Sequence, residues 1–278
     1  MTYEYRNLAL EAVRVTEAAA LAAFDHVGHG NEEIADRSSV HAMYNALKTL
    51  PIHGCIAIGE EQYGMEQKLF TGQKVGNGEG PIADVALVPL EGASIIARGG
   101  YNAISVLAIT EQGGFPNVPR VYMDKIALGP GYPNDLISID ETPEANIKAV
   151  AKSLGIKVSE IVVCILDRPR HSELVNAVRK VGSRIRLILD GDVSGAVSVT
   201  RSQSGVHMYM GTGLAPQGVL AAAGIQAAGG QMQARLIIRD SNDREKVLLA
   251  GIEDSDKIYV LSDMTGKDVT FAATGITS

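Results

Sequence analysis

The sequence predicts an α/β fold in which helices are layered against β-sheets. Two observations carry this prediction. After Pro143, helical and extended patterns alternate along the chain, which implies a partly parallel sheet that holds ligands beyond the carboxyl ends of its strands. Before Pro143, two long helical patterns precede a series of short apolar runs typical of strands. We therefore expect two halves, residues 1–140 and residues 141–278, joined tightly enough to count as one domain.

Length and composition are those of a globular protein with a sizeable core. The chain has 278 residues, of which 46% are hydrophobic, and a formal net charge of -7. This acidic balance argues against a nucleic-acid partner or an anionic membrane surface. No stretch approaches the roughly 20 apolar residues that cross a bilayer, so we expect a cytoplasmic protein with no membrane partner. Cys55 and Cys164 lie in apolar runs and are expected to be buried free thiols.

The expected elements of the first half are two helices followed by strands. Apolar residues recur at helical spacing in both helices, and Gly28 and Pro51 end them. The last two strands are expected to pair with each other across a turn that contains Gly113 and Gly114. The helices are expected at 5–27 and 36–50, and the strands at 53–58, 83–88, 103–110 and 121–128.

The second half is expected to alternate between helices and strands. The helices are expected within 141–155 and 171–182, and the strands within 161–167 and 184–190. Each of these strands ends in a cluster of polar residues. Gly211 and Gly213 then predict a turn, after which Pro216 opens an alanine-rich helix.

The stretch from Gly76 to Gly100 predicts a strand, an abrupt turn and the start of a helix. This junction places Glu91 at the carboxyl end of the strand, beside the backbone amides of Gly92, Ala93 and Ser94. Amides at a helix start favour anions, and a carboxylate beside them suits a metal ion bound to a phosphate. The alternative interpretation is that Glu91 is an exposed turn residue.

The segment VPLEGA within this stretch resembles the Asp-Pro-Ile-Glu-Gly-Thr motif of metal-dependent sugar bisphosphatases. Together with the segments below, it makes the chain similar, almost end to end, to the class II fructose-1,6-bisphosphatases of the lithium-sensitive phosphatase superfamily. The resemblance implies an αβαβα sandwich of the sugar-phosphatase type. It also shows two altered motif positions, Val88 in place of Asp and Ala93 in place of Thr, and a shorter C-terminal part.

The resemblance implies a Mg²⁺ or Mn²⁺ site built from carboxylates. Its ligands would be Asp36, Glu60, Glu91 and Gln217, where the family has Glu at the last position. Glu60 and Glu91 would also serve catalysis. Without the family, Asp36 is equally a helix cap, and Glu60 a solvated loop charge. Nearby carboxylates that could replace the lost ligand are Asp84 and Glu61.

A sugar-phosphate site is expected beyond the strand ends of the second half. Arg168, Pro169 and Arg170 follow a buried strand, where two guanidinium groups beside a stiff proline make a good phosphate clamp. By resemblance this clamp would hold the phosphate remote from the metal ions. Tyr122 would reach the same substrate, although cross-strand packing explains it equally well.

The second strand end carries Asp190, Gly191 and Asp192. By resemblance these residues would hydrogen-bond sugar hydroxyls, while a metal site or a helix cap would also explain the two aspartates. Gly92 and Ala93 complete the expected substrate contacts of the first half, and His171 is expected to be structural.

The activity implied by the resemblance is metal-dependent hydrolysis of a sugar (bis)phosphate. Only three of the five family carboxylate positions keep a carboxylate, and Ala93 lacks the hydroxyl that would orient the attacking water, so we expect at most one well-held metal ion and very slow turnover. The alternatives are an inactive paralogue that binds a sugar phosphate or an active relative, and, more weakly, a nucleotide-binding protein. A homo-oligomer, dimer or tetramer, is expected from the resemblance. Its subunits would share apolar surface of the first helix and of the alanine-rich helix.

Overall fold

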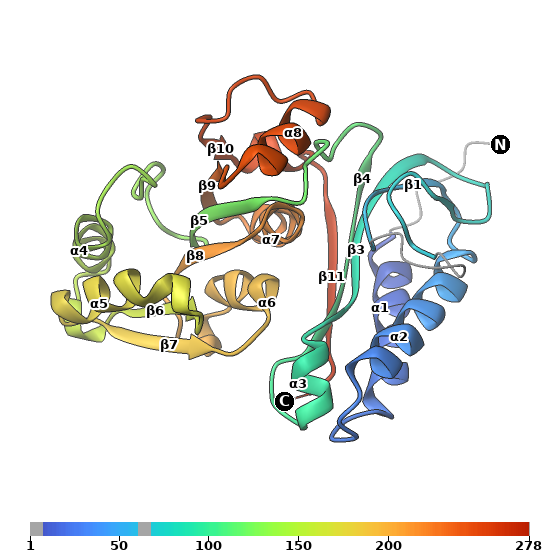
Figure 1. The fold of residues 1–278 in the computed structure, drawn as a ribbon, viewed down its shortest axis with the longest axis horizontal. Coiled ribbons are helices and arrows are strands. Elements are labelled where there is room, and N and C mark those ends of the chain that lie inside the picture. The colour runs from blue at the N-terminus through green and yellow to red at the C-terminus, as the bar shows by residue number, and fades with distance from the viewer. Residues whose placement is uncertain (1–7, 61–67, 278) are drawn as a thin grey trace. The chain divides into compact units, whose positions relative to one another are not determined.

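The computed structural model describes residues 8–60 and 68–277 (Figure 1). It confirms the α/β class, with one five-stranded and one six-stranded mixed sheet among these residues. The chain divides into two compact units, the first formed by Met1–Pro116 with Thr265–Ser278 and the second by Asn117–Met264. The division at Pro116 differs from the expected one at residue 140, because the strand at 122–128 pairs within the second unit.

The first unit is a sheet with two helices on one face. Residues of both helices, among them Val15 and Met43, form a buried core with Val85, Leu87 and Leu107 of the sheet. Its sheet order is β11-β4-β3-β1-β2. The elements are α1 Ala9–Phe24, α2 Glu32–Leu47, β1 His53–Ile58, β2 Lys74–Val75, β3 Ile82–Glu91, α3 Ala93–Arg98, β4 Ile104–Glu111 and β11 Thr270–Gly275.

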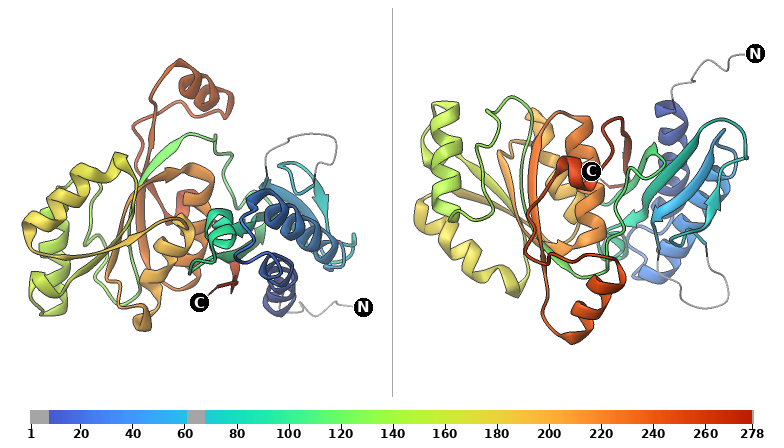
Figure 2. Two further views of the ribbon diagram at one scale, coloured as in Figure 1. Left: turned by 60° about the horizontal axis from the view of Figure 1, so that its bottom comes forward. Right: turned by 90° about the horizontal axis from the view of Figure 1, so that it is seen from above.

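The second unit is a sheet covered by helices on both faces, α4 and α5 on one face and α6 and α7 on the other (Figure 1 and Figure 2). Its sheet order is β10-β9-β5-β8-β6-β7. Taken separately, the first unit has one helical layer on its sheet and the second has a sheet between two helical layers. The elements are β5 Tyr122–Leu128, α4 Pro143–Leu154, β6 Val162–Leu166, α5 Ser172–Val181, β7 Arg184–Ile188, α6 Asp192–Val197, β8 Met208–Leu214, α7 Ala215–Ala227, β9 Gln231–Ile237, α8 Ser241–Leu249, β10 Tyr259–Val260 and α9 Leu261–Met264.

Four strands of the second sheet end at the same edge. β6 is parallel to β7 and β8, while β8 and β9 are both antiparallel to β5 and therefore run in one direction. We call the edge at which β6, β7, β8 and β9 end the carboxyl edge. Tyr122 begins β5 and pairs with Leu214 and Ile237, the last residues of β8 and β9, so it lies at this edge. The chain segments that follow four strands therefore meet around Tyr122.

Two expectations about strands are wrong. β4 and β5 do not pair with each other, because β4 pairs with β3 and β11 while β5 pairs with β8 and β9. Gly211 and Gly213 form no turn but lie inside β8. A Cβ atom at Gly213 would lie 2.0 Å from a carboxylate oxygen of Asp192, so this strand position needs glycine for space.

The helix starts also differ in detail from the expectation. Helix α2 begins at Glu32, and the side chain of Asn31 caps it by accepting a hydrogen bond from the backbone N–H of Ile34 at 3.0 Å. Asp36 is therefore not a cap and lies in the second turn of the helix. The alanine-rich helix α7 does contain Pro216 in its first turn, as expected. Because most of α7 is buried within the chain, it offers no apolar surface to another subunit.

Cys55 and Cys164 form no disulfide bond, and none of the described helices is long and apolar enough to span a membrane. Cys164 is buried in β6, and Cys55 is half-buried in β1. Burial raises the pKa of the Cys164 thiol to about 12, with the nearby Arg186 opposing this effect. The Cys164 thiol therefore stays protonated and unreactive at neutral pH.

Candidate functional site

The junction at Glu91 forms as the sequence predicts. β3 runs through Pro89 to Glu91, with an irregular register against β4 after Val88, and Gly92 takes the left-handed conformation (φ 96°) before α3 begins at Ala93. Glu91 is only 6% exposed, which rules out the interpretation as an exposed turn residue. A buried carboxylate at a strand end is costly unless it meets donors or a cation, so this position suits a functional group.

Asp36 is a second desolvated carboxylate of the first unit. Its side chain is half-buried on α2, and it has no hydrogen-bond or ion-pair partner in the described part of the chain. Burial raises the pKa of its carboxyl group. A nearby divalent cation would reverse this effect, because an opposite charge favours the ionised form.

Glu60 carries the third carboxylate. It follows β1, and its backbone forms an isolated β-bridge with Phe70. Of the two carboxylates considered as replacements for the lost ligand, Asp84 is excluded. It lies at the opposite end of β3 from Glu91 and accepts a hydrogen bond from the backbone N–H of Gly113 at 2.8 Å. Glu61 lies outside the described residues.

The donor set for a metal ion is incomplete. Within residues 8–60 and 68–277, no three His, Cys, Asp or Glu side chains are grouped so that they could hold one. Gln217, in the first turn of α7, contributes a buried amide oxygen, Oε1, that has no hydrogen-bond partner among these residues. Asp36 and Gln217 thus both present oxygen atoms that lack a partner, and oxygen is the donor that Mg²⁺ and Mn²⁺ prefer. By donor chemistry these oxygen atoms suit a hard cation, although the described residues do not gather three charged ligands in one place.

The two arginines after β6 have different hydrogen-bond partners. Arg168 donates to the backbone oxygens of Asp167, at 3.1 Å, and of Leu189, and lies 3.8 Å from Asp190. The Arg168 side chain therefore connects the segment after β6 to the segment after β7. Arg170 donates from Nε and Nη2 to the carbonyl oxygen of Thr212, at 3.0 and 2.9 Å, and forms no ion pair with any described residue.

Arg170 also lies over the ring of Tyr122, with 5.0 Å between its guanidinium carbon and the ring centroid. A second guanidinium group, that of Arg239, lies over the same ring at 4.4 Å. Arg239 follows β9 at the carboxyl edge and was not singled out from the sequence. Its position two residues after a strand, like that of Arg168, is the pattern that could have identified it.

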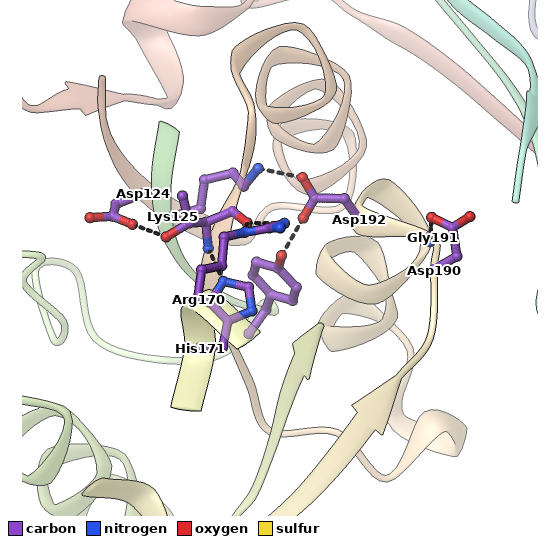
Figure 3. A network of polar contacts seen from close by, with 9 residues as sticks. Asp124, Lys125, Arg170, His171, Asp190, Gly191 and Asp192 are labelled. Carbon is purple, nitrogen blue, oxygen red and sulfur yellow. Dashed lines mark hydrogen bonds and ion pairs between the residues drawn. The ribbon is translucent and has the colours of Figure 1, made fainter. Parts of the chain in front are cut away.

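Asp192 belongs to a buried polar network (Figure 3). One of its carboxylate oxygens accepts a hydrogen bond from Lys125 Nζ and the other accepts one from the hydroxyl of Tyr209, and all three residues are buried. Asp190 is more accessible, with 32% of its side chain exposed. Of the two aspartates expected to bind sugar hydroxyls, Asp190 is therefore the one whose carboxylate a ligand can reach.

His171 holds the backbone that positions Arg170. Its Nδ1 donates to the carbonyl oxygen of Leu166 at 2.7 Å, and its Nε2 accepts from the backbone N–H of Thr212 at 2.8 Å. This pattern requires the neutral imidazole, and burial lowers the pKa of His171 in the same sense. The structural role expected for His171 agrees with these contacts, since its only described partners are backbone groups.

Known proteins are similar to this chain along almost its whole length. A model of the family described as "Bacterial fructose-1,6-bisphosphatase, glpX-encoded" matches residues 6–278. The chain belongs to this family. Proteins named D-fructose 1,6-bisphosphatase class 2/sedoheptulose 1,7-bisphosphatase are 37% identical in Synechococcus sp., over 296 residues, and 36% identical in Prochlorococcus marinus, over 286 residues. Each alignment covers 98% of this chain and 85% of the relative.

Among solved structures, the extragenic suppressor protein suhB from Bartonella henselae is similar at 12% identity and a TM-score of 0.41. The alignment covers 83% of this chain and 86% of that one. A likeness this distant says nothing about activity. Membership of the bisphosphatase family rests on the sequence match along the chain.

Proposed function

We propose that this chain is a cytoplasmic, metal-dependent phosphoric monoester hydrolase that acts on a sugar bisphosphate, with fructose 1,6-bisphosphate as the first substrate to test. The observation that carries the proposal is the guanidinium group of Arg170, which stacks on Tyr122 at the carboxyl edge and has no carboxylate to neutralise it in the described structure. A cation held there by backbone and ring contacts is preorganised for a phosphate group.

In this proposal the candidate residues have two different roles. Arg170 and Tyr122 hold the phosphate that is not hydrolysed, and Asp190 accepts hydrogen bonds from sugar hydroxyls. Asp36, Glu60, Glu91 and Gln217 would hold the divalent cation, Mg²⁺ or Mn²⁺. When bound, such an ion polarises a phosphoryl group and lowers the pKa of water.

The residues proposed to hold the metal ion and the attacking water decide how fast this chemistry proceeds. The backbone at Gly92 and Ala93 is placed beside Glu91 for contact with the reacting phosphate. Ala93 has no hydroxyl to orient a water molecule, Val88 has no oxygen, and Gln217 is uncharged. We therefore infer slow turnover, because loss of outer-shell partners alone costs about 10- to 100-fold in metal affinity or activity.

These three positions favour a second candidate function. If hydrolysis is lost altogether, the retained arrangement of Arg170, Tyr122 and Asp190 would still bind a sugar phosphate, and the chain would act as a binding or regulatory paralogue. The two functions share the site of the second unit and differ only in the chemistry of the first.

Phosphate release from fructose 1,6-bisphosphate separates the two functions. With Mn²⁺ or Mg²⁺ we expect a slow rate that a chelator abolishes and that Glu91→Gln reduces at least about 100-fold, since a buried ligand charge is lost. The matched control is Glu79→Gln, an exposed glutamate of the same stretch, which should keep the rate. A rate unaffected by Glu91→Gln would remove this site from the mechanism, and no release at all would favour the paralogue.

We further propose that two copies of the chain associate through α1. Leu10, Leu21 and Phe24 are 71%, 70% and 58% exposed on this helix. When two copies of α1 pack antiparallel about a two-fold axis centred between Val15 and Thr16, Leu10 of one copy faces Leu21 of the other. Arg14 then faces Glu17, so the stripe is complementary to itself in both shape and charge.

Light scattering in solution tests this association. We expect a mass of twice 29.4 kDa, or a multiple of that dimer, and a monomer for Leu21→Glu, because a charge in the centre of an apolar contact is not compensated. Leu248→Glu, on the equally exposed surface of α8 (65%), is the control and should leave the mass unchanged. A monomeric natural protein at tens of micromolar would contradict the proposal.

A further inference from the structure

We propose that Arg239 binds the sugar phosphate together with Arg170, around the ring of Tyr122, in place of Arg168. This inference rests on the proposed function and adds a phosphate ligand that the sequence analysis did not assign. It concerns only residues of the second unit, all of them at the carboxyl edge.

The first step is that two cationic side chains contact the ring of Tyr122. The guanidinium carbons of Arg170 and Arg239 lie 5.0 and 4.4 Å from the centroid of its ring. Stacking on an aromatic ring leaves the edge of a guanidinium group, with its N–H donors, open to a further ligand. Because these carbons lie 5.0 and 4.4 Å from one point, they are at most 9.4 Å apart, and we infer that one phosphate between them contacts both groups.

The second step is that the Arg239 side chain is held in place before any ligand arrives. Its Nε and Nη2 donate to the two carboxylate oxygens of Asp243, at 2.8 and 3.3 Å. Asp243 is fully buried in the first turn of α8, behind the cap residue Asp240. The hydrogen bonds from Arg239 lower the pKa of the Asp243 carboxyl group, so the pair stays ionised. A side chain already ordered in this way loses little conformational entropy on binding.

The third step concerns the positive charge of Arg170, which no ion pair neutralises among the described residues. Asp243 neutralises Arg239, whereas Arg170 forms no ion pair with any described residue. A phosphate monoester brings close to two negative charges and several acceptor oxygens. Nη1 of each arginine is free of hydrogen bonds to described residues and can donate to it.

Arg168, the expected partner of Arg170, already contacts other groups of the protein. Its Nη1 donates to two backbone oxygens, and its Nη2 faces Asp190. Unlike Arg170 and Arg239, Arg168 does not stack on Tyr122 in the described structure, and binding a phosphate would require it to release the end of β7. The pair that the geometry offers to a phosphate is therefore Arg170 with Arg239.

Calorimetric titration of fructose 6-phosphate into the full chain, at constant salt and with chelator present, tests the proposal. Arg239→Gln is expected to weaken binding about tenfold or more, the loss typical of one charge-assisted hydrogen-bonding partner. Because this variant leaves Asp243 buried and unpaired, a second variant, Arg239→Met with Asp243→Leu, removes both charges and keeps the net charge and the packing. It should show the same loss of affinity.

The control is Arg244→Gln, an exposed arginine of α8 that should not change the affinity. Neutral fructose is the second probe and should bind no better to the natural protein than to either variant. Natural affinity in the Arg239→Met, Asp243→Leu protein would overturn the role of Arg239 and leave the proposed function intact. Failure of the natural protein to bind fructose 6-phosphate would overturn both.

Discussion

A variant that carries Val88→Asp, Ala93→Thr and Gln217→Glu is expected to release phosphate from fructose 1,6-bisphosphate about 100-fold faster than the natural chain in Mn²⁺. The three changes restore two carboxylate ligands and one hydroxyl. Val88 is half-buried near the end of β3, so an aspartate there can reach solvent or an ion. Gln217 already places an oxygen without a partner in a buried position, and glutamate has almost the same shape.

The matched control for this variant replaces Val88 with Asn and keeps the other two changes. Asparagine has the shape of aspartate without its charge, and metal affinity depends on the number of charged ligands. The gain should therefore be much smaller. The aspartate variant should also melt at a higher temperature when Mn²⁺ is added, because a ligand that binds only the folded state stabilises it. A folded variant that binds Mn²⁺ but is no faster than the natural chain would refute this account of the substitutions.

Asp192→Asn is expected to destabilise the second unit by about 3–5 kcal/mol, the usual cost of removing one partner from a buried ion pair. The change leaves Lys125, whose side chain is 0% exposed, as a buried cation without its counterion. It also weakens the hydrogen bond from the hydroxyl of Tyr209. Urea unfolding followed by circular dichroism measures the loss.

The control for Asp192→Asn is Asp190→Asn, two residues earlier. The Asp190 side chain is 32% exposed and lies 3.8 Å from Arg168, so its loss should cost less than about 1 kcal/mol. Equal stability losses in the two variants would show that the buried network around Asp192 does not hold the carboxyl edge together. The predicted difference would assign Asp192 to structure and leave Asp190 as the sugar-binding aspartate.

Local sequence patterns were enough to locate most of the functional elements. The turn at Glu91 was predictable because Gly92 supplies a conformation that other residues avoid, between an apolar strand and a helix start. The polar clusters around Arg170 and Asp190 were predictable because side chains that follow parallel strands gather at one edge. Both rules use only residues that are neighbours in the chain.

Features that depend on distant residues were missed. The partners of β4 and β5 could not be inferred, since adjacent strands in sequence normally pair and here they belong to different sheets. Gly213 suggested a turn, whereas it makes room for Asp192 from another element. Arg239 was not singled out, because Tyr122 is far from it in the sequence and only the fold places the two side by side.

The central claim is that the second unit keeps a sugar-phosphate site although the first unit has lost part of its metal site. The most direct test is the equilibrium titration of the natural protein with fructose 6-phosphate in chelator, where neither hydrolysis nor metal binding contributes. We expect saturable binding within the range of about 1 μM to 1 mM in which enzymes usually meet their substrates, and none of fructose. No saturation by fructose 6-phosphate well above that range would contradict the claim.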